Sequence, residues 1–525
     1  MLTLIKNGLI IDGKGNEAFL GNILLKDDKI IDVTSQVIDE SNVEKIIDAK
    51  GCLVAPGFID VHSHSDAYLI IEPSAPSKIS QGITTEINGQ CGGSIAPRFG
   101  EARLSSDWAK LLGERLTWNS LLQYREVFDS VKPAINSVQF VGHNTLRAST
   151  MGYAGKVASQ EDMQKMKYLL DKTLDEGAWG LTTGLIYQPG KYSTQEEVIS
   201  LASCVSKKGG FYATHMRSEG DKLLESIDEV IELARKTEIK AEISHLKTSG
   251  KNNWGKVDDA IEKIQDAISK GFLLGADRYP YCAAGTDLDV VFPDWAGEGA
   301  SLAEMKRLKD CNIRKRIVDE LNESDRDWGS VMIGGTWCDE TKKYSGKNIA
   351  EICAVENKTP GEVVCEILEK DECLTGAFFH GMSEENLTKI FSCDWVLAGS
   401  DASLRAPWGP LGKDHPHPRA YGTMIEFFHR VKAISSRENA VKRMTYDAAK
   451  RFEIPKRGVL EKGYYADIVI FDENEFSSLS TYANPHKFAM GVKYVFVNGV
   501  LSYKEGDFKI NHSLANRAGR FLERN

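Results

Sequence analysis

The sequence predicts an α/β protein: a (β/α)8 TIM barrel with a small β-sandwich domain formed by both termini and an inserted subdomain after the seventh barrel strand. Two observations predict the barrel. Short apolar strands alternate with amphipathic helical segments through the middle of the chain. Eight such strands over this length fit a closed parallel barrel. A third observation, strand-like segments near both ends, predicts the terminal domain.

The terminal segments read as β-structure in short pieces. Residues 1–56 contain LTLIKNGLIID and GNILLKDDKIIDV, and they are predicted to form the first part of the sandwich. Residues 431–525 are predicted to supply a C-terminal helix and the second part, because YYADIVIFD and KYVFVNGVLSY are separated by turn residues.

The barrel domain is predicted to occupy residues 57–430. Helical segments such as SQEDMQKMKYLLDKTLDEG lie between its strands. Far more chain separates the last two strands than a βα loop needs, which indicates an inserted subdomain at about 286–345. The eight predicted strands are LVAPGFIDV, ITTEI, SVQFVG, GLTTG, GFYATH, IKAEISH, FLLGADRY and WVLAGSD.

Composition narrows the class of protein. The 525 residues carry a net charge of −10, which argues against nucleic acid or an anionic membrane as a partner. The first residues lack the features of a signal peptide, and the ten cysteines form no CxxC pair. We therefore expect a cytoplasmic enzyme that acts on a small molecule. The oligomeric state is left open, with a homo-oligomer among the expectations.

Metal-binding residue types collect at the ends of the predicted strands. His62 and His64 close the first strand, and residues i and i+2 of a strand point the same way, so both face the barrel mouth. Each residue alone has an ordinary structural explanation, but their coincidence at one end favours a metal site. Imidazole, thiolate and carboxylate ligands suit zinc, while manganese, iron and cobalt stay compatible. The other candidates at strand ends are Cys91, His143, His215, His245 and Asp401.

These motifs resemble the amidohydrolase superfamily. GFIDVHSHSD is similar to its HxH signature, and single histidines after strands 5 and 6 and an aspartate after strand 8 fit as well. Many members also have a lysine on strand 4, where GLTTG has none. The cysteine in INGQCGGS resembles instead the branch of D-aminoacylases, the N-acyl-D-amino-acid deacylases. Further segments similar to that branch are GHNTLR, GLTTGLIYQPGKYS, ATHMRSEGD, SHLKTSG, ADRYPYCAAGTDL, HPRAYGT and GVLEKGYYADIVIFD.

The resemblance implies an activity and a ligand set. It implies zinc-dependent hydrolysis of N-acyl-D-amino acids to a carboxylate and a free D-amino acid. It places the tighter zinc site at Cys91, His215 and His245. His62, His64 and Asp401, with Cys91 as a bridge, form a second site that is weaker or empty.

Chemistry suggests roles for the remaining candidates. A metal-bound hydroxide is the expected nucleophile, with Asp401 as the general base and later the general acid. Tyr187, just past strand 4, is a candidate donor to the substrate carbonyl, as the resemblance also implies. The residues expected to bind substrate, above all its α-carboxylate, are Lys247, Tyr281, Arg419 and His143, with Arg217, Arg278 and Arg405 as further candidates.

Two alternatives remain at this point. The chain could be a cyclic-amide hydrolase of the hydantoinase or dihydroorotase kind, although those relatives generally use the missing strand-4 lysine. It could also be a non-catalytic scaffold that kept the amidohydrolase fold. The sequence does not decide between apolar and acidic side chains of the D-amino acid, and it does not identify the acyl group.

Overall fold

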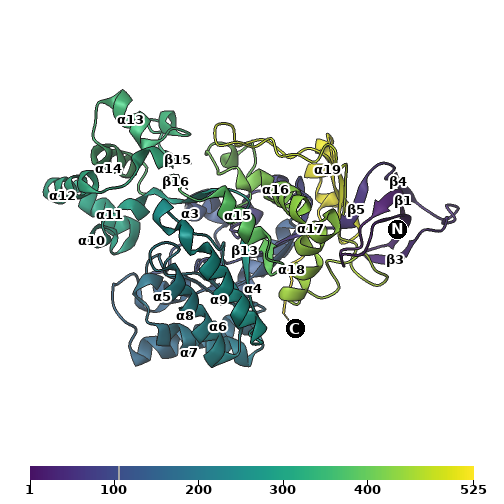
Figure 1. Ribbon diagram of the computed structural model, residues 1–525, viewed down its shortest axis with the longest axis horizontal. Helices are drawn as coiled ribbons and strands as arrows, with labels where there is room; N and C mark the ends of the chain where they lie inside the picture. The colour runs from purple at the N-terminus through teal and green to yellow at the C-terminus, as the bar shows by residue number, and fades with distance from the viewer. Residues whose placement is uncertain (105–106, 525) are drawn as a thin grey trace.

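The computed structural model describes residues 1–104 and 107–524, so residue 525 of the predicted C-terminal segment lies outside the described residues. The chain forms three regions: a central α/β barrel, a sheet domain that contains both ends of the chain, and a lobe inserted into the barrel (Figure 1). No described helix is both long and apolar enough to cross a membrane.

The barrel strands run parallel and follow the predicted order. They fall into two sheets, β6-β7-β8 and β9-β10-β11-β12-β13-β17. Phe140 alone separates β8 from β9, and the Val61 N–H donates to the Ala398 carbonyl, which joins β6 to β17. The bounds are β6 (Phe58–Asp60), β7 (Ile83–Asn88), β8 (Asn136–Gln139), β9 (Val141–Gly142), β10 (Gly180–Gly184), β11 (Phe211–His215), β12 (Lys240–Ile243), β13 (Leu274–Arg278) and β17 (Val396–Ala398).

Amphipathic helices follow the barrel strands. In α6 (Gln160–Asp175), Ser159 caps the first turn, and Met166, Leu170 and Leu174 repeat every four residues on the buried face. The next helices, α7 (Gln195–Lys207), α8 (Leu223–Thr237) and α9 (Val257–Ser269), pack side by side around the strands (Figure 1). The others are α1 (Tyr68–Ile71), α2 (Pro76–Ile79), α3 (Trp108–Leu112), α4 (Leu121–Val131), α5 (His143–Met151), α15 (Glu384–Phe391), α16 (Arg419–Ile434), α17 (Arg437–Met444) and α18 (Tyr446–Arg451).

The first predicted strand, LVAPGFIDV, is divided between two sheets. Its first half is β5 (Leu53–Pro56) in the terminal domain, and its second half is β6 in the barrel. Gly57 lies at the division, where a Cβ atom would come 2.2 Å from the Thr84 hydroxyl oxygen. Only glycine fits this close approach, so the apolar run that looks continuous in sequence changes sheets there.

The terminal domain is one eight-stranded sheet built from both ends of the chain. Its order is β20-β19-β18-β5-β1-β2-β3, with β4 beside β1. In Figure 1 the yellow C-terminal segment accordingly lies beside the purple N-terminal strands. The bounds are β1 (Leu2–Ile10), β2 (Phe19–Lys26), β3 (Lys29–Thr34), β4 (Lys45–Asp48), β18 (Ile468–Phe471), β19 (Val492–Val497) and β20 (Val500–Lys504), followed by α19 (Phe508–His512).

The inserted lobe follows β13 and has its own sheet and core. Its antiparallel sheet has the order β14-β16-β15, with β14 (Ala283–Asp287), β15 (Val331–Ile333) and β16 (Gly376–His380). Because β16 returns to pair with β14, the lobe extends well beyond the predicted end near residue 345. Its helices are α10 (Asp294–Gly297), α11 (Ala300–Lys309), α12 (Cys311–Glu323), α13 (Ile349–Glu356) and α14 (Pro360–Lys370), labelled as a separate group in Figure 1.

Candidate metal centre

Metal-binding side chains follow five different barrel strands at their carboxyl ends. His62 and His64 come just after β6, and Cys91 comes after β7. His215 is the last residue of β11, and His245 lies two residues past β12. Asp401 follows β17 and completes the set. Parallel strands end at the same rim of a barrel, which brings these side chains together although the chain separates them widely.

The side chains form two groups that share one residue. Within each group the ligand atoms lie within 4.8 Å of one another. The Cys91 Sγ atom lies 3.3 Å from His62 Nε2 and 3.4 Å from His245 Nε2. The first group is Cys91, His215 and His245, and the second is His62, His64, Cys91 and Asp401. The sequence-predicted ligands therefore meet at one place, with the cysteine between the two groups.

The first group has the chemistry that a divalent cation requires. The His215 side chain is buried, yet neither of its ring nitrogens has a hydrogen-bond partner in the described part of the chain. Burial raises the pKa of the Cys91 thiol, but the His62 and His245 imidazoles outweigh it and hold the pKa well below its usual range. A thiolate beside two imidazoles fits zinc, and the only ion-pair contact of the His215 ring among the described residues is at 3.5 Å, to Glu219.

Backbone conformation also distinguishes these residues. Cys91, His245 and Asp401 have φ angles of 52°, 39° and 48°, in the left-handed region that residues with a Cβ atom rarely adopt. Each such conformation costs about 1–3 kcal/mol, and functional sites are one place where such strain collects. The three residues lie just past the ends of β7, β12 and β17.

Two carboxylates contact the Nδ1 atoms of His62 and His245, the ring nitrogens that face away from Cys91. His62 Nδ1 lies 3.0 Å from Asp277 Oδ2, and His245 Nδ1 lies 2.8 Å from Glu219 Oε1. Asp277 fixes the tautomer of His62, so that its Nε2 atom faces the thiolate. His245 Nδ1 also lies 2.7 Å from Lys247 Nζ. Asp277 and Glu219 are not among the site residues predicted from the sequence. Their positions carried the signal, because Asp277 is the penultimate residue of β13 and Glu219 follows His215 by four residues.

A buried lysine ties the first barrel strand to the last one beneath the site. Lys78 Nζ donates to Asp60 Oδ2 at 2.8 Å and to the Ala402 carbonyl at 2.8 Å. It also donates to the hydroxyls of Ser63 and Ser400, each at 3.0 Å. These residues flank the HxH pair after one strand and Asp401 after the other. The Lys78 ammonium group therefore fixes the distance between the HxH pair and Asp401.

We expect Lys78→Met to lower the free energy of unfolding by about 3–5 kcal/mol, because it leaves the buried Asp60 carboxylate without its partner. Lys110→Met is the matched control: its ion pair with Glu372 is exposed, so the change should stay within about 1 kcal/mol. Urea unfolding of both variants measures the difference. Equal effects of the two substitutions would contradict the role of Lys78.

A group of cationic residues lies next to Asp401. Arg419 Nη1 is 2.8 Å from Asp401 Oδ2, and the Arg419 guanidinium carbon lies 4.6 Å from the ring centre of Tyr279. The Lys247 ammonium lies on the same ring, 5.9 Å from its centre, and is held by Glu219. All of these side chains are largely buried. Both cations are thus paired with carboxylates of the site, Arg419 with Asp401 and Lys247 with Glu219.

The tyrosine that contacts these cations is Tyr279, which is not among the residues predicted from the sequence. The predicted residue, Tyr281, directs its hydroxyl toward α16: a Cβ atom on Gly422 would come 2.4 Å from it. The Tyr279 hydroxyl is buried without a hydrogen-bond partner among the described residues. Burial raises the pKa of Tyr279, but Lys247 and other cations outweigh it and lower the pKa. Both tyrosines lie past the end of β13 at Arg278, so strand alternation does not distinguish between them.

Tyr187 lies just past β10, next to His215. Its ring packs edge-on against the His215 ring at 4.9 Å, and its hydroxyl lies 3.2 Å from Thr286 Oγ1 of the inserted lobe. Burial raises the pKa of Tyr187 well above its usual value, so the hydroxyl keeps its proton at neutral pH. It is therefore available as a hydrogen-bond donor near the metal groups.

His143 lies in a different environment from the other predicted site residues. It is fully buried, and its Nε2 atom is 2.7 Å from Glu197 Oε1. Arg147 donates to the same carboxylate. These contacts link α5 to α7 on the outside of the barrel and involve neither metal group. They favour a structural role over the predicted contact with substrate.

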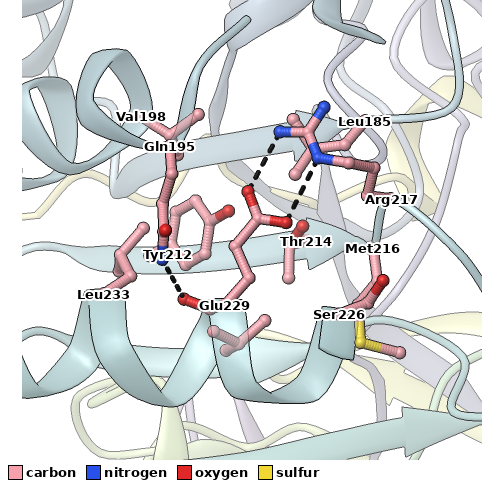
Figure 2. A pocket seen from close by; sticks show the side chains of 11 residues that line it. Leu185, Gln195, Val198, Tyr212, Thr214, Met216, Arg217, Ser226, Glu229 and Leu233 are labelled. Atoms are coloured by element: carbon pink, nitrogen blue, oxygen red, sulfur yellow. Dashed lines mark hydrogen bonds and ion pairs between the residues drawn. The ribbon is translucent and has the colours of Figure 1, made fainter. Parts of the chain in front are cut away.

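The three further arginine candidates have partners within the protein. Arg217 donates twice to Glu229 beside a small cavity next to β11, as Figure 2 shows. Arg405 Nε lies 2.9 Å from Asp414 Oδ2. Arg278 donates to the Tyr281 carbonyl at 2.9 Å. None of these contacts directs a guanidinium toward the metal groups.

Comparison with known proteins finds amidohydrolases, and among them deacylases of N-acyl-D-amino acids. Two profiles, each of an amidohydrolase family, match residues 45–271 and 410–501. A D-aminoacylase of Alcaligenes xylosoxydans xylosoxydans is 30% identical over 99% of this chain and 97% of its own length. An N-acyl-D-glutamate deacylase of the same organism is 28% identical over 99% of this chain and 96% of its own length.

The solved structures that are similar to this chain include members of the same two groups of deacylases. A crystal structure of a D-aminoacylase matches with a TM-score of 0.82 and 30% identity, and 99% of each chain is covered. An N-acyl-D-glutamate deacylase from Bordetella bronchiseptica, complexed with zinc and a phosphonate mimic of the tetrahedral intermediate, matches with a TM-score of 0.82 at 28% identity, again over 99% of each chain. A D-hydantoinase, at 14% identity and a TM-score of 0.56, shares the fold only.

Proposed function

Because the chain belongs to the amidohydrolase family, in the branch of the D-aminoacylases, we propose that it hydrolyses the amide bond of N-acyl-D-amino acids with the help of a divalent metal ion. The products are a carboxylate and a free D-amino acid. The observation that carries this proposal is the convergence of Cys91, His215 and His245 from three strand ends into one group of ligand atoms.

These three residues would hold zinc, and the second group, His62, His64 and Asp401 with Cys91, would hold a second and weaker ion. Bound zinc supplies a Lewis acid and lowers the pKa of water toward 7. The thiolate form of Cys91 supports this assignment, as does the buried His215 ring, which has no hydrogen-bond partner among the described residues. The strand-4 lysine of many amidohydrolases has no counterpart in GLTTG, and the residue that the two groups share is Cys91.

Asp401 is the proposed proton carrier. Burial raises the pKa of this carboxyl, but Arg419 and the imidazoles outweigh it and hold the pKa well below its usual range. At neutral pH Asp401 is therefore a carboxylate that accepts the proton of the attacking water and then delivers it to the leaving amine. Its Oδ1 atom lies 3.1 Å from His64 Nε2, which keeps it at the second metal group.

Substrate recognition is assigned to four residues near the metal groups. Lys247, Tyr279 and Arg419 would meet the α-carboxylate, because together they present two cations and a hydroxyl without a partner. Tyr187 would donate to the carbonyl oxygen of the scissile amide. The preference for the D-enantiomer is supported by the substrates named for the relatives.

All ten cysteines are free of disulfide bonds, which supports the cytoplasmic location that the sequence predicts.

A substrate screen tests the proposed function. We expect the zinc-supplied chain to hydrolyse N-acetyl-D-amino acids and to leave the L-enantiomers, hydantoin and dihydroorotate unchanged. N-acetyl-D-methionine, N-acetyl-D-glutamate and N-acetyl-D-aspartate resolve the open question of an apolar or acidic side chain. Release of the free amine measures the reaction. Turnover of the cyclic amides alone would identify a cyclic-amide hydrolase instead.

A further inference from the structure

The inserted lobe supplies a hydroxyl group to the proposed active site. Thr286, on β14, lies 99 residues from Tyr187 in sequence, yet the two side-chain oxygens are 3.2 Å apart. Either hydroxyl can donate in this pair. Tyr187 is the proposed donor to the substrate carbonyl, so whatever holds its hydroxyl affects the chemical step.

The position of Thr286 is fixed by the surrounding strands. β14 pairs with β16 through five consecutive residues, and Thr286 stands opposite Ala377. The preceding carbonyl, that of Gly285, accepts from Arg419 Nη2 at 3.1 Å. The Leu288 N–H donates to the Thr375 carbonyl at 2.8 Å. The backbone around Thr286 is therefore fixed by two contacts: the pairing of β14 with β16 in the lobe, and the hydrogen bond from Arg419 to Gly285.

The loop that carries Tyr187 is attached to the same lobe. The next residue, Gln188, accepts from the N–H groups of Gly299 at 2.9 Å and Ala300 at 3.2 Å. Its side-chain amide also donates to the Gly297 carbonyl. These bonds dock the backbone beside Tyr187 onto the turn between α10 and α11. The hydroxyl and the backbone of this loop are thus both placed by the insertion.

We propose that Thr286 is a positioning residue for the hydrolysis: its hydroxyl donates to the Tyr187 oxygen and leaves the Tyr187 proton free to point at the carbonyl oxygen of the substrate. This inference rests on the proposed function. A hydroxyl has one proton to donate, so accepting a hydrogen bond from Thr286 directs that proton toward the substrate. The accepted bond also polarises the Tyr187 O–H and strengthens its own donation.

Two substitutions at Thr286 separate the hydroxyl from the shape of the side chain. Thr286→Val keeps the shape and removes the hydroxyl, while Thr286→Ser keeps the hydroxyl. With an N-acetyl-D-amino acid that the wild-type chain hydrolyses, we expect Thr286→Val to lower kcat by about fivefold with KM unchanged, the usual effect of one hydrogen bond. Thr286→Ser should keep the wild-type kcat. Wild-type kcat in Thr286→Val, or an equal loss in both variants, overturns the proposal.

A double-mutant cycle tests whether the effect passes through Tyr187. In a Tyr187→Phe background, Thr286→Val should cause no further loss, because there is no phenol left to position. If that background is too slow to assay, affinity for a phosphonate analogue of the tetrahedral intermediate completes the same cycle. If the loss in the double variant equals the product of the two single losses, the proposed role of Thr286 is overturned, while the proposed function is unaffected. A wild-type chain that turns over no N-acyl-D-amino acid overturns the proposed function, and this inference with it.

Discussion

Asp401→Asn is expected to lower kcat by about 10²–10⁴-fold, the range of general acid–base catalysis, while the fold is preserved. The amide has nearly the same size as the carboxylate but cannot accept the proton of the attacking water. Steady-state kinetics on N-acetyl-D-amino acids measure the loss, and thermal unfolding monitors the fold. The tight zinc ion should remain, because Cys91, His215 and His245 form a group without Asp401.

Asp414→Asn provides the matched control for this substitution. Asp414 is also an ion-paired aspartate in the segment after β17, but its partner is Arg405 and it belongs to neither metal group. Its kcat should therefore stay close to the wild-type value. An Asp401→Asn variant that retains wild-type kcat would exclude Asp401 as the proton carrier.

Cys91→Ser is expected to remove zinc and, with it, turnover. The loss of a residue that only supports a ligand costs about 10–100-fold in metal affinity, and the loss of a direct ligand costs more. Because Cys91 belongs to both groups, a single substitution disrupts both. Elemental analysis gives the zinc content, and competition with a chromophoric chelator gives the affinity.

Cys204→Ser is the control for Cys91→Ser. Cys204 is half-buried on α7 and contacts only the Ser200 carbonyl of its own helix among the described hydrogen bonds. Zinc content and kcat should both stay at wild-type levels. A Cys91→Ser chain that binds zinc as tightly as this control would show that the thiolate is not a ligand.

The HxH pair and the strand-end residues could be predicted from the sequence because they depend on local rules. Alternation on a strand places His62 and His64 on one side, and parallel strands bring their carboxyl ends to one rim. The terminal sheet domain was predictable for the same reason, since turns and short apolar runs mark its strands. The fold class is confirmed by the solved relatives.

The parts that could not be predicted depend on contacts between distant segments. The division at Gly57 follows from the close approach of Thr84, which no local pattern reveals. The full extent of the insertion depends on the pairing of β14 with β16, whose residues lie almost a hundred positions apart. The proximity of Tyr279 to the cations has a related cause: the chain leaves strand geometry after Arg278, so alternation does not decide between Tyr279 and Tyr281.

Zinc titration of the metal-free chain, followed by the turnover of N-acetyl-D-amino acids, tests the central claim most directly. The account predicts a folded chain that is inactive without metal and whose activity on D-substrates rises to a maximum at about one zinc per chain, the occupancy of one three-ligand site. A folded chain that takes up no zinc, or one that is saturated with zinc and cleaves no N-acyl-D-amino acid, would contradict it.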